Sequence, residues 1–310
     1  MKLIHAANEL KPGSKKVCLA IGFFDGVHLG HQQIIRQTIA DARQHNALAL
    51  VLTFDRHPDA IVAPDRIPPL IYSLPQKLRA IESLGVDTLL LIRFDEKFSR
   101  QTGEQFVRNL ARETGQIQSL CVGADFVFGH KRSGSVALLK KLGGEIGFVV
   151  HGLAAVSLDG QIVSSTRIRE IIRAGNLDAA SQMLGRPYAL SGRVVKGARL
   201  GQQLGFPTAN LDATGLVLPP NGVYAGLANV QGRTCRAALN IGFRPTVSST
   251  SQLTYVEAHL LNFSGELYGL ELEVEIGEKL RDEKKFASTA ELREQIARDI
   301  AAVTAKLCFS

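Results

Sequence analysis

The chain has 310 residues, which is long enough for two domains of ordinary size. Its composition, with 45% hydrophobic and 21% charged residues, is that of a soluble globular protein, and no apolar run reaches the roughly 20 residues that a transmembrane helix needs. The net charge of +7 is thinly spread and there is no Trp, which argues against a nucleic-acid-binding surface. We expect a protein that handles anionic small molecules, without nucleic-acid or membrane partners, as a monomer or weak homo-oligomer.

The N-terminus and the cysteines predict a cytoplasmic protein. Residues 1–16 lack the apolar core and the cleavage site of a secretory signal. The cysteines are far apart in the sequence and form no CxxC pair, and Cys18 and Cys121 lie in apolar runs. We interpret these two as buried, reduced thiols. The other two are Cys235 and Cys308.

Residues 17–156 alternate short apolar runs with amphipathic stretches. Continuous apolar runs are typical of parallel strands that are covered on both faces, so the pattern predicts a doubly wound α/β domain. The predicted strands are 17–22, 47–54, 87–94, 119–126 and 148–156, and the predicted helices are 30–45, 74–84, 102–115 and 134–147. In such a sheet ligands bind at the carboxyl ends of the strands.

The pattern changes after residue 188, where short β-like runs are separated by turn signals. We expect a compact antiparallel barrel, preceded by two short helices and followed by a C-terminal helix. The predicted strands are 189–195, 222–230, 234–242, 253–261 and 270–277, and the predicted helices are 166–174, 176–184 and 288–306. The chain is thus α/β plus all-β, with domains at residues 1–185 and 186–310.

The stretch GFFDGVHLGH, residues 22–31, follows the first predicted strand and precedes a helix. A helix N-terminus favours an anion, because its backbone N–H groups are unpaired and the helix dipole is positive there. Glycines at 22, 26 and 30 permit tight turns and a close approach of backbone to ligand. His28 and His31 could then donate hydrogen bonds to phosphate oxygens. Capping or packing histidines and a metal site are the alternatives.

The HxGH of this stretch resembles the signature of the nucleotidylyltransferase superfamily, and VSSTRIR at 163–169 resembles its second signature. The resemblance implies that ATP is joined to a phosphate monoester with release of pyrophosphate. We assign His28 and His31 to the ATP phosphates and to transition-state charge, and Arg169 to the pyrophosphate. The predicted ATP-binding residues are Gly22, Phe23, Asp25, Gly30, Ser165 and Thr166. Asp25 either orders this site or holds the turn, and we favour the turn.

Two further stretches end predicted strands at the same edge of the sheet, TFDRHP at 53–58 and VGADFVFGHKRSG at 122–134. Phe126 has the spacing of a core residue. Phe128 lies past the predicted strand end, where its ring could stack on a planar ligand. Lys131 and Arg132 are either a solvated pair or contacts of the acceptor's phosphate.

The second half contains KGARLGQQLGFPTANL at 196–211, a glycine-spaced loop that could wrap phosphates although it is not a Walker loop. Gly197 and Gly205 are candidate ATP-binding residues. Thr208 and Asn210 lie two apart on an extended segment, so both could coordinate Mg²⁺, unless they only begin a strand. Glu257 lies opposite the apolar face of its predicted strand. It is a candidate general base or a solvent-facing residue.

Together with GVYAG (222–226), NIGFRPT (240–246), VEAHLLNF (256–263) and LRDEKKF (280–286), these motifs are similar to the riboflavin kinase module. Along nearly its whole length the chain resembles the bacterial bifunctional riboflavin kinase/FAD synthetase family. That resemblance implies a Rossmann-like nucleotidylyltransferase domain and a riboflavin-kinase β-barrel. It also implies that Thr208 and Asn210 bind Mg²⁺-ATP and that Glu257 deprotonates the riboflavin 5′-hydroxyl, with FMN and FAD as products. Asp125, Phe128 and, more weakly, Arg281 would contact the flavin.

Three positions depart from the family pattern, Arg56, Ser135 and Asn262. None of them has a chemical role in this interpretation. The alternatives are a single-activity adenylyltransferase whose barrel only binds ligand, and a non-catalytic flavin- or RNA-binding protein. The PTAN and Glu257 pattern disfavours the first, and the intact HxGH and SSTRIR disfavour the second.

Overall fold

The computed structural model describes residues 1–10, 15–197, 200–230, 232–244 and 253–306. Cys308 and parts of the motifs at 196–211 and 240–246 lie outside these residues. The chain divides into two compact units, one of Met1–Pro68 and Leu74–Ser165, the other of Pro69–Ser73 and Thr166–Ser310. The domain boundary at residues 185/186 stays a prediction.

The first unit is built on a six-stranded parallel sheet, which confirms the predicted α/β architecture. The strand order is β1-β4-β3-β2-β5-β8. These strands are β1 (Lys2–Ile4), β2 (Val17–Ile21), β3 (Leu48–Phe54), β4 (Thr88–Ile92), β5 (Ile117–Gly123) and β8 (Val149–Leu153). β1 has only three residues, and the sequence pattern did not predict it. β5 ends at Gly123, so the predicted strand over 119–126 was too long.

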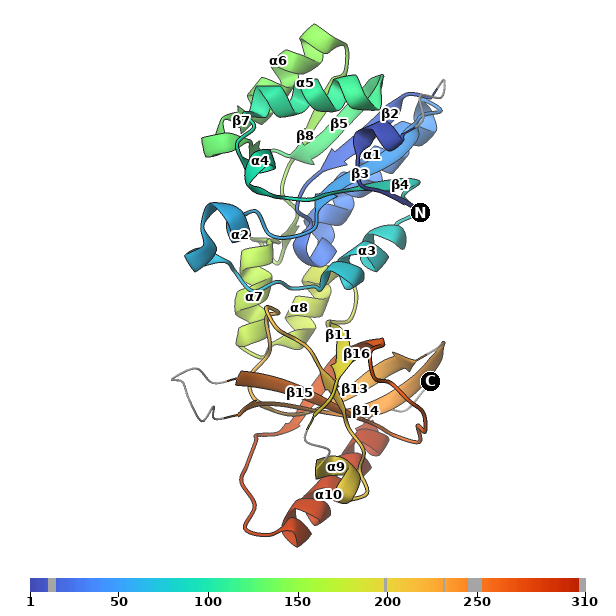
Figure 1. Cartoon of the computed structure of the whole chain (residues 1–310), viewed down its shortest axis with the longest axis vertical. Coiled ribbons are helices and arrows are strands. Elements are labelled where there is room, and N and C mark those ends of the chain that lie inside the picture. The colour runs from blue at the N-terminus through green and yellow to red at the C-terminus, as the bar shows by residue number, and fades with distance from the viewer. Residues whose placement is uncertain (11–14, 198–199, 231, 245–252, 307–310) are drawn as a thin grey trace. The chain divides into compact units, whose positions relative to one another are not determined.

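Two apolar clusters cover the two faces of this sheet with different helices. Leu19 and Leu50 pack on one face with residues of α5 and α6, while Ala20 and Val51 pack on the other with residues of α1 and α3 (Figure 1). The helices are α1 (Leu29–Gln44), α3 (Leu74–Glu82), α5 (Gly103–Thr114) and α6 (Val136–Ile146). Cys18 and Cys121 are buried free thiols, as predicted; Cys235 is a free thiol at an intermediate exposure.

Helix boundaries in this unit follow the capping residues. The side chain of Thr102 accepts a hydrogen bond from the Gln105 N–H at 3.2 Å, and the Gln105 side chain accepts one from the Thr102 N–H at 3.0 Å. This reciprocal pair is a capping box, and it begins α5. Gly115, with φ of 80°, ends the helix, because a residue without a Cβ adopts positive φ without strain.

Short elements connect the larger ones. The short helices are α2 (Asp59–Val62) and α4 (Glu96–Ser99), with 3₁₀ turns η1 (Ala7–Glu9), η2 (Asp25–Val27), η3 (Pro64–Arg66) and η4 (His130–Arg132). β6 (Val127–Phe128) pairs with β7 (Gly134–Ser135), and β9 (Ser157–Leu158) pairs with β10 (Gln161–Ile162). Of the three departures from the family pattern, Ser135 caps α6 by accepting from the Leu138 N–H at 3.3 Å, and Arg56 pairs with Asp55 at 2.9 Å. Asn262 adopts a φ of 56°.

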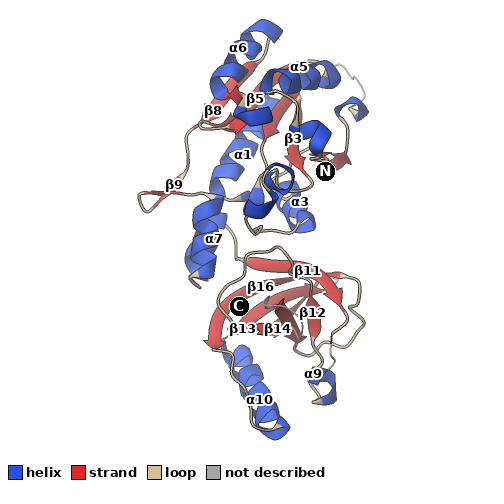
Figure 2. Ribbon diagram, turned by 60° about the vertical axis from the view of Figure 1, so that its left-hand side comes forward, coloured by secondary structure: helices blue, strands red, loops and turns tan. Residues whose placement is uncertain are grey.

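The second unit is a closed antiparallel barrel, as predicted, with strand order β11-β12-β15-β14-β13-β16 (Figure 2). The strands are β11 (Ala189–Val195), β12 (Ala209–Leu211), β13 (Gly222–Val230), β14 (Arg233–Arg244), β15 (Leu253–Leu260) and β16 (Glu271–Arg281). The helices are α7 (Ser165–Arg173), α8 (Leu177–Leu184), α9 (Leu200–Gln203) and α10 (Thr289–Lys306). Ser288 caps α10 by accepting from the Glu291 N–H at 3.2 Å.

Residues 69–73 belong to this second unit although they come from the middle of the first. The Leu70 N–H donates to the Gly215 carbonyl at 2.7 Å, and the Leu70 carbonyl accepts from the Val217 N–H at 2.8 Å. The Tyr72 hydroxyl accepts from Nε of Arg186 at 3.0 Å. Across the described residues, no helix is long and apolar enough to span a membrane.

Candidate functional site

The loop of residues 22–31 leaves the carboxyl end of β2 at the point where the strand order reverses. β3, β4 and β1 lie on one side of β2, and β5 and β8 lie on the other. In an open parallel sheet such a point forms a crevice for ligands. His28 is the N-cap of α1, so both predicted histidines lie at a helix N-terminus.

The two imidazoles are stacked, with ring centroids 3.6 Å apart and planes inclined by 21°. Nδ1 of His28 accepts a hydrogen bond from the His31 backbone N–H at 3.4 Å. In its neutral form His28 therefore carries its proton on Nε2, the nitrogen that can donate to a phosphate oxygen. A Cβ at Gly30 would lie 3.2 Å from Cε1 of His28, so a glycine there leaves room for the ring.

Backbone strain and side-chain hydrogen bonds shape the turn before His28. Phe24 and Val27 have φ of 54° and 42°, a region that non-glycine residues rarely adopt. The Ser165 hydroxyl donates to the Asp25 carbonyl at 3.1 Å, and the side-chain amide of Gln32 donates to the Val27 carbonyl at 3.0 Å. Ser165, from the second predicted motif, thus contacts the first motif directly.

The SSTRIR motif forms the first turns of α7. Ser165 belongs to the first unit, whereas Thr166 and Arg169 belong to the second. Thr166 is exposed. Arg169 is buried, and its Nε donates to the Pro69 carbonyl at 2.7 Å. The phosphate-binding roles of Thr166 and Arg169 stay predictions.

An aromatic pocket of about 670 Å³ opens in the first unit. Its lining includes Phe23, which follows β2, Phe54, which ends β3, and Phe128 of β6. Phe128 stacks on Phe126 with centroids 5.2 Å apart and planes inclined by 16°. Phe126, predicted within a strand, lies in the turn after β5. Over the described residues the lining does not include Asp125, which is exposed.

Lys131 and Arg132 line the same pocket. Both have positive φ, 53° and 59°, directly after Gly129 with φ of 73° and His130. Consecutive left-handed residues are costly, so a backbone that keeps them is constrained by its surroundings. Both residues are exposed, so contact with an anionic group of a ligand stays a prediction.

In the barrel, strand pairing brings two predicted polar positions, Asn210 and Glu257, into one row with a third polar residue, Asn240. Glu257 on β15 lies opposite Asn210 on β12 and opposite Asn240 on β14. Direct cross-strand partners project from the same face of a sheet. Val256, Ala258 and Leu260 are buried, so they occupy the opposite face, as the sequence predicted.

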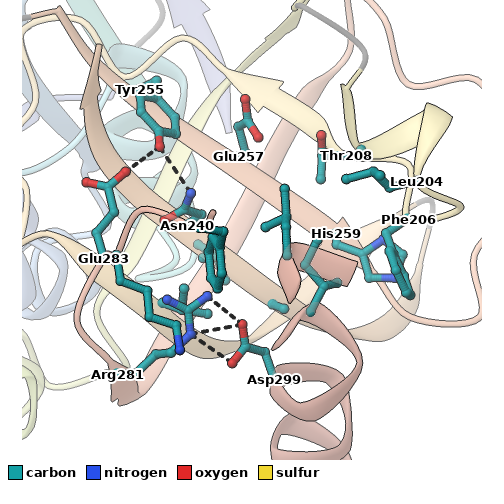
Figure 3. Close-up of a pocket in the computed structure, with 18 residues that line it drawn as sticks. Leu204, Phe206, Thr208, Asn240, Tyr255, Glu257, His259, Arg281, Glu283 and Asp299 are labelled. Carbon is teal, nitrogen blue, oxygen red and sulfur yellow. Dashed lines mark hydrogen bonds and ion pairs between the residues drawn. The ribbon is translucent and has the colours of Figure 1, made fainter. Parts of the chain in front are cut away.

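A pocket of about 570 Å³ lies against part of this row, and among the described residues its lining includes Asn240 and Glu257 but not Asn210. Thr208, Asn240 and Glu257 line it, and residues of the segment after β16 and of α10 complete the lining (Figure 3). The Tyr255 hydroxyl donates to Glu283 at 2.5 Å and accepts from the Asn240 amide at 3.2 Å. Burial and the bonded carboxylate raise the pKa of Tyr255, so the phenol keeps its proton and acts as the donor.

The glycine-spaced loop supports these residues in different ways. A Cβ at Gly197 would lie 2.3 Å from Nδ2 of Asn210, so the backbone there packs against that carboxamide. Gly205 has φ of 88° and open space around it, so backbone conformation requires a glycine. Gly197 thus packs directly on one of the two predicted metal ligands.

Arg281 lines the barrel pocket, and its guanidinium is already paired (Figure 3). Nε and a terminal nitrogen of Arg281 donate to the two carboxylate oxygens of Asp299 on α10, at 2.9 and 2.7 Å. Such a fork-shaped pair fixes the side chain in one orientation. The flavin contact predicted for Arg281 stays a prediction, and the pair itself fastens the end of β16 to α10.

Sequence reasoning missed several residues at these sites. Asn240, Tyr255 and Glu283 line the barrel pocket and bond one another, yet no spacing in the sequence relates them. Lys77 is 3% exposed and contacts the loop of residues 22–31 at the Phe23 carbonyl. Its signal was a lysine inside the apolar stripe of Leu74, Leu78 and Ile81 on one helix.

Comparisons with known proteins match both halves of the chain. A family model described as FAD synthetase matches residues 10–167, and one described as riboflavin kinase matches residues 184–307. The curated bifunctional riboflavin kinase/FMN adenylyltransferase of Escherichia coli K12 is 38% identical, with 96% of each chain covered. The Haemophilus influenzae enzyme of the same name is 37% identical, and the similarity covers 99% of this chain and 98% of that protein.

One solved structure is similar over the same length. It is described as a macrolide-efflux protein from Streptococcus pneumoniae, and the similarity has a TM-score of 0.81 at 27% sequence identity. It covers 99% of both chains. The parallel-sheet unit and the barrel unit are therefore both shared with a known structure.

Proposed function

The chain belongs to the family of bifunctional riboflavin kinase/FMN adenylyltransferases, and we propose which of its residues carry the two reactions. It phosphorylates riboflavin to FMN through its riboflavin kinase region and adenylylates FMN to FAD through its FAD synthetase region. ATP is the co-substrate of both steps. We assign FAD formation to the loop of residues 22–31 and FMN formation to the row around Glu257.

In adenylyl transfer a phosphate oxygen of FMN attacks the α-phosphorus of ATP. A new O–P bond forms, the bond to the bridging oxygen of the β-phosphate breaks, and pyrophosphate leaves. Alignment and charge neutralisation limit such a displacement more than a protein nucleophile does. His28 donates from Nε2 to the charge that develops on the phosphate oxygens, and His31, stacked on it, shares this role.

The remaining residues of this site bind the two substrates. ATP phosphates bind at the α1 N-terminus and at the backbone of Gly22, Phe23 and Gly30. The leaving pyrophosphate binds to Ser165, Thr166 and Arg169, an assignment that rests on their sequence motif. Asp25 holds the turn. Phe128 contacts the isoalloxazine ring in the aromatic pocket, and Lys131 and Arg132 contact the FMN phosphate, as their place in its lining favours. Asp125, which is exposed, has the weakest support as a flavin contact.

In the kinase step Glu257 takes the proton of the riboflavin 5′-hydroxyl as that oxygen attacks the γ-phosphorus of ATP. The bond to the β-phosphate oxygen breaks and ADP leaves. Glu257 pairs with Asn210, so the proposed base lies next to a residue that we assign to Mg²⁺. Gly197 and Gly205 allow the loop before β12 to approach the nucleotide, and Arg281 borders the flavin side of the pocket.

The Thr208 and Asn210 side chains fit Mg²⁺, which prefers hard oxygen ligands. They offer a hydroxyl and a carbonyl oxygen two residues apart at the start of β12, and Gly197 leaves the Asn210 carboxamide the space it occupies. A site with two neutral oxygens suits an ion that keeps waters and takes further oxygens from phosphates. When bound, Mg²⁺ would neutralise phosphate charge.

The kinase assignment rests on the cross-strand pairing of Asn210 with Glu257. A barrel that only bound a flavin or nucleotide would not need a base beside a Mg²⁺ ligand. The test is to incubate the purified chain with riboflavin, ATP and Mg²⁺ and to separate the flavins by chromatography. Both FMN and FAD are expected. If FMN forms without FAD, the assignment of residues 22–31 to FAD formation is wrong. If neither FMN nor FAD forms, both site assignments are wrong.

A further inference from the structure

Lys77 is a buried cation to which neither reaction described above gives a role. It lies on α3 in the first unit and is 3% exposed. Burial lowers the pKa of its ammonium to about 8, against the opposing effects of the Asp25 and Asp55 carboxylates. A cation that is costly to bury persists where something specific holds it.

Three oxygens receive the ammonium of Lys77. Nζ lies 2.9 Å from the Phe54 carbonyl, 3.2 Å from the Phe23 carbonyl and 3.3 Å from the Thr53 hydroxyl. The three donors of an ammonium match three acceptors. Nζ also lies 4.2 Å from the centroid of the Phe23 ring, within range of a cation–π interaction. Lys77 therefore fastens the loop after β2 to the end of β3.

The bond to Phe23 is one of a series. Three alternate carbonyls of the turn before His28 each accept a hydrogen bond from a side chain of another element. The pairs are Phe23 with Lys77 at 3.2 Å, Asp25 with Ser165 at 3.1 Å, and Val27 with Gln32 at 3.0 Å. Each bond ties one side of the turn to a different helix.

The turn needs such support because its backbone is strained. Phe24 and Val27 both have positive φ, and the surroundings must hold a non-glycine residue in that conformation. His28 follows Val27 directly and caps α1. The shape of the turn thus decides where the stacked imidazoles of His28 and His31 lie.

We propose that Lys77 is a positioning residue for adenylyl transfer, whose ammonium holds the Phe23 carbonyl and with it the turn that carries His28 and His31. The inference rests on the proposed function of these histidines. Lys77 does not contact the reacting atoms. Its loss displaces the imidazoles instead, and such a displacement affects turnover more than substrate affinity.

The test compares Lys77→Met with Lys141→Met in the full-length chain. Methionine keeps the length of the side chain and removes the charge and the donors. Lys141 is exposed on α6 of the same unit and serves as the matched control. For Lys77→Met we expect kcat of FAD formation to fall about 10²-fold. KM for FMN should change far less, riboflavin phosphorylation should stay normal, and Lys141→Met should resemble the wild type.

Thr53→Val is a second, milder variant that tests the same proposal if Lys77→Met fails to fold. Valine has the shape of threonine, and the lost hydroxyl bonds both Lys77 and the Phe23 carbonyl, the latter at 2.9 Å. For Thr53→Val we expect kcat of FAD formation to fall selectively as well, but by less than in Lys77→Met. A folded Lys77→Met enzyme with kcat within about threefold of wild type would overturn the inference. So would an equal loss of both activities. A wild type that makes no FAD would instead refute the proposed function.

Discussion

Asn210 and Glu257 face each other across β12 and β15, as directly paired residues whose side chains project from the same face. One pairing register thus fixes the separation between a proposed Mg²⁺ ligand and a proposed base. A shift of β12 by one residue would turn Asn210 to the opposite face. The relative position of these two proposed groups is therefore set by the register of the barrel strands.

Replacing Glu257 by glutamine removes the proposed base and keeps the shape of the side chain. We expect riboflavin phosphorylation to fall about 10²- to 10⁴-fold, the usual contribution of a general base, while added FMN is still converted to FAD. Chromatography of reactions started from riboflavin or from FMN separates the two outcomes. Glu275→Gln, at an exposed position on β16, is the control. Near-normal kinase turnover in Glu257→Gln would show that Glu257 is not the base.

Two substitutions at His28 separate its chemistry from its role as a helix cap. Asparagine keeps an acceptor for the His31 N–H, whereas alanine does not. Both variants should lose FAD formation by about 10²- to 10³-fold and accumulate FMN. Alanine alone should also lose about 1 kcal/mol of stability, measured by urea unfolding. If His28→Asn formed FAD at the wild-type rate, His28 would only cap the helix and would have no role in catalysis.

Gly197→Ala should weaken ATP binding in the kinase reaction. The added Cβ would lie 2.3 Å from Nδ2 of Asn210, so the carboxamide must move. We expect a raised KM for ATP in riboflavin phosphorylation and unchanged FAD formation from FMN. The matched control is Gly144→Ala on α6, where the Cβ has nothing within 4 Å. That variant should gain up to about 1 kcal/mol of stability from helix propensity.

The buried ammonium of Lys77 predicts a pH-dependent stability. Its pKa is lowered to about 8 in the folded chain, from an ordinary value of 10.5 for a solvated lysine. Between these values the unfolded chain binds more protons, so the free energy of unfolding rises with pH, by up to about 3 kcal/mol across the window. Below this window both states are protonated and the full cost of burial is present.

Urea unfolding of wild type and Lys77→Met at about pH 7.5 and about pH 9.5 measures this effect. Other titrating groups contribute equally to both proteins, so only the difference between them reports Lys77. We expect the wild type to gain stability relative to Lys77→Met at the higher pH. Equal changes in the two proteins would show that Lys77 keeps an ordinary pKa in the folded state.

The sequence predicted the architecture because its strongest signals are local. Continuous apolar runs identified five of the parallel strands, and the predicted helices 102–115 and 288–306 begin at Thr102 and Ser288, which are caps in the structure. β1 has three residues, which is too short for any period to emerge. Phe126 was placed in a strand because apolar residues continue past Gly123, where β5 ends.

The polar groups that surround the sites were harder to predict. Asn240 meets Glu257 only through strand register, and Tyr255 meets Glu283 across 28 residues of chain. No short-range pattern encodes such contacts. Lys77 does leave a signal, a charge in an apolar stripe, but lysine is almost always exposed, so this signal does not by itself predict a buried ammonium. Buried polar networks of this kind require the tertiary structure.

The discontinuous second unit affects how the two activities can be separated by truncation. A fragment that begins at the predicted boundary, residue 186, would lack residues 69–73, and with them both backbone hydrogen bonds of Leu70 to Gly215 and Val217. Arg186 would also lose the Tyr72 hydroxyl. An excised kinase fragment would thus expose a strip that the intact chain covers with its own earlier residues. Activities are therefore better separated by point substitutions than by cutting the gene in two.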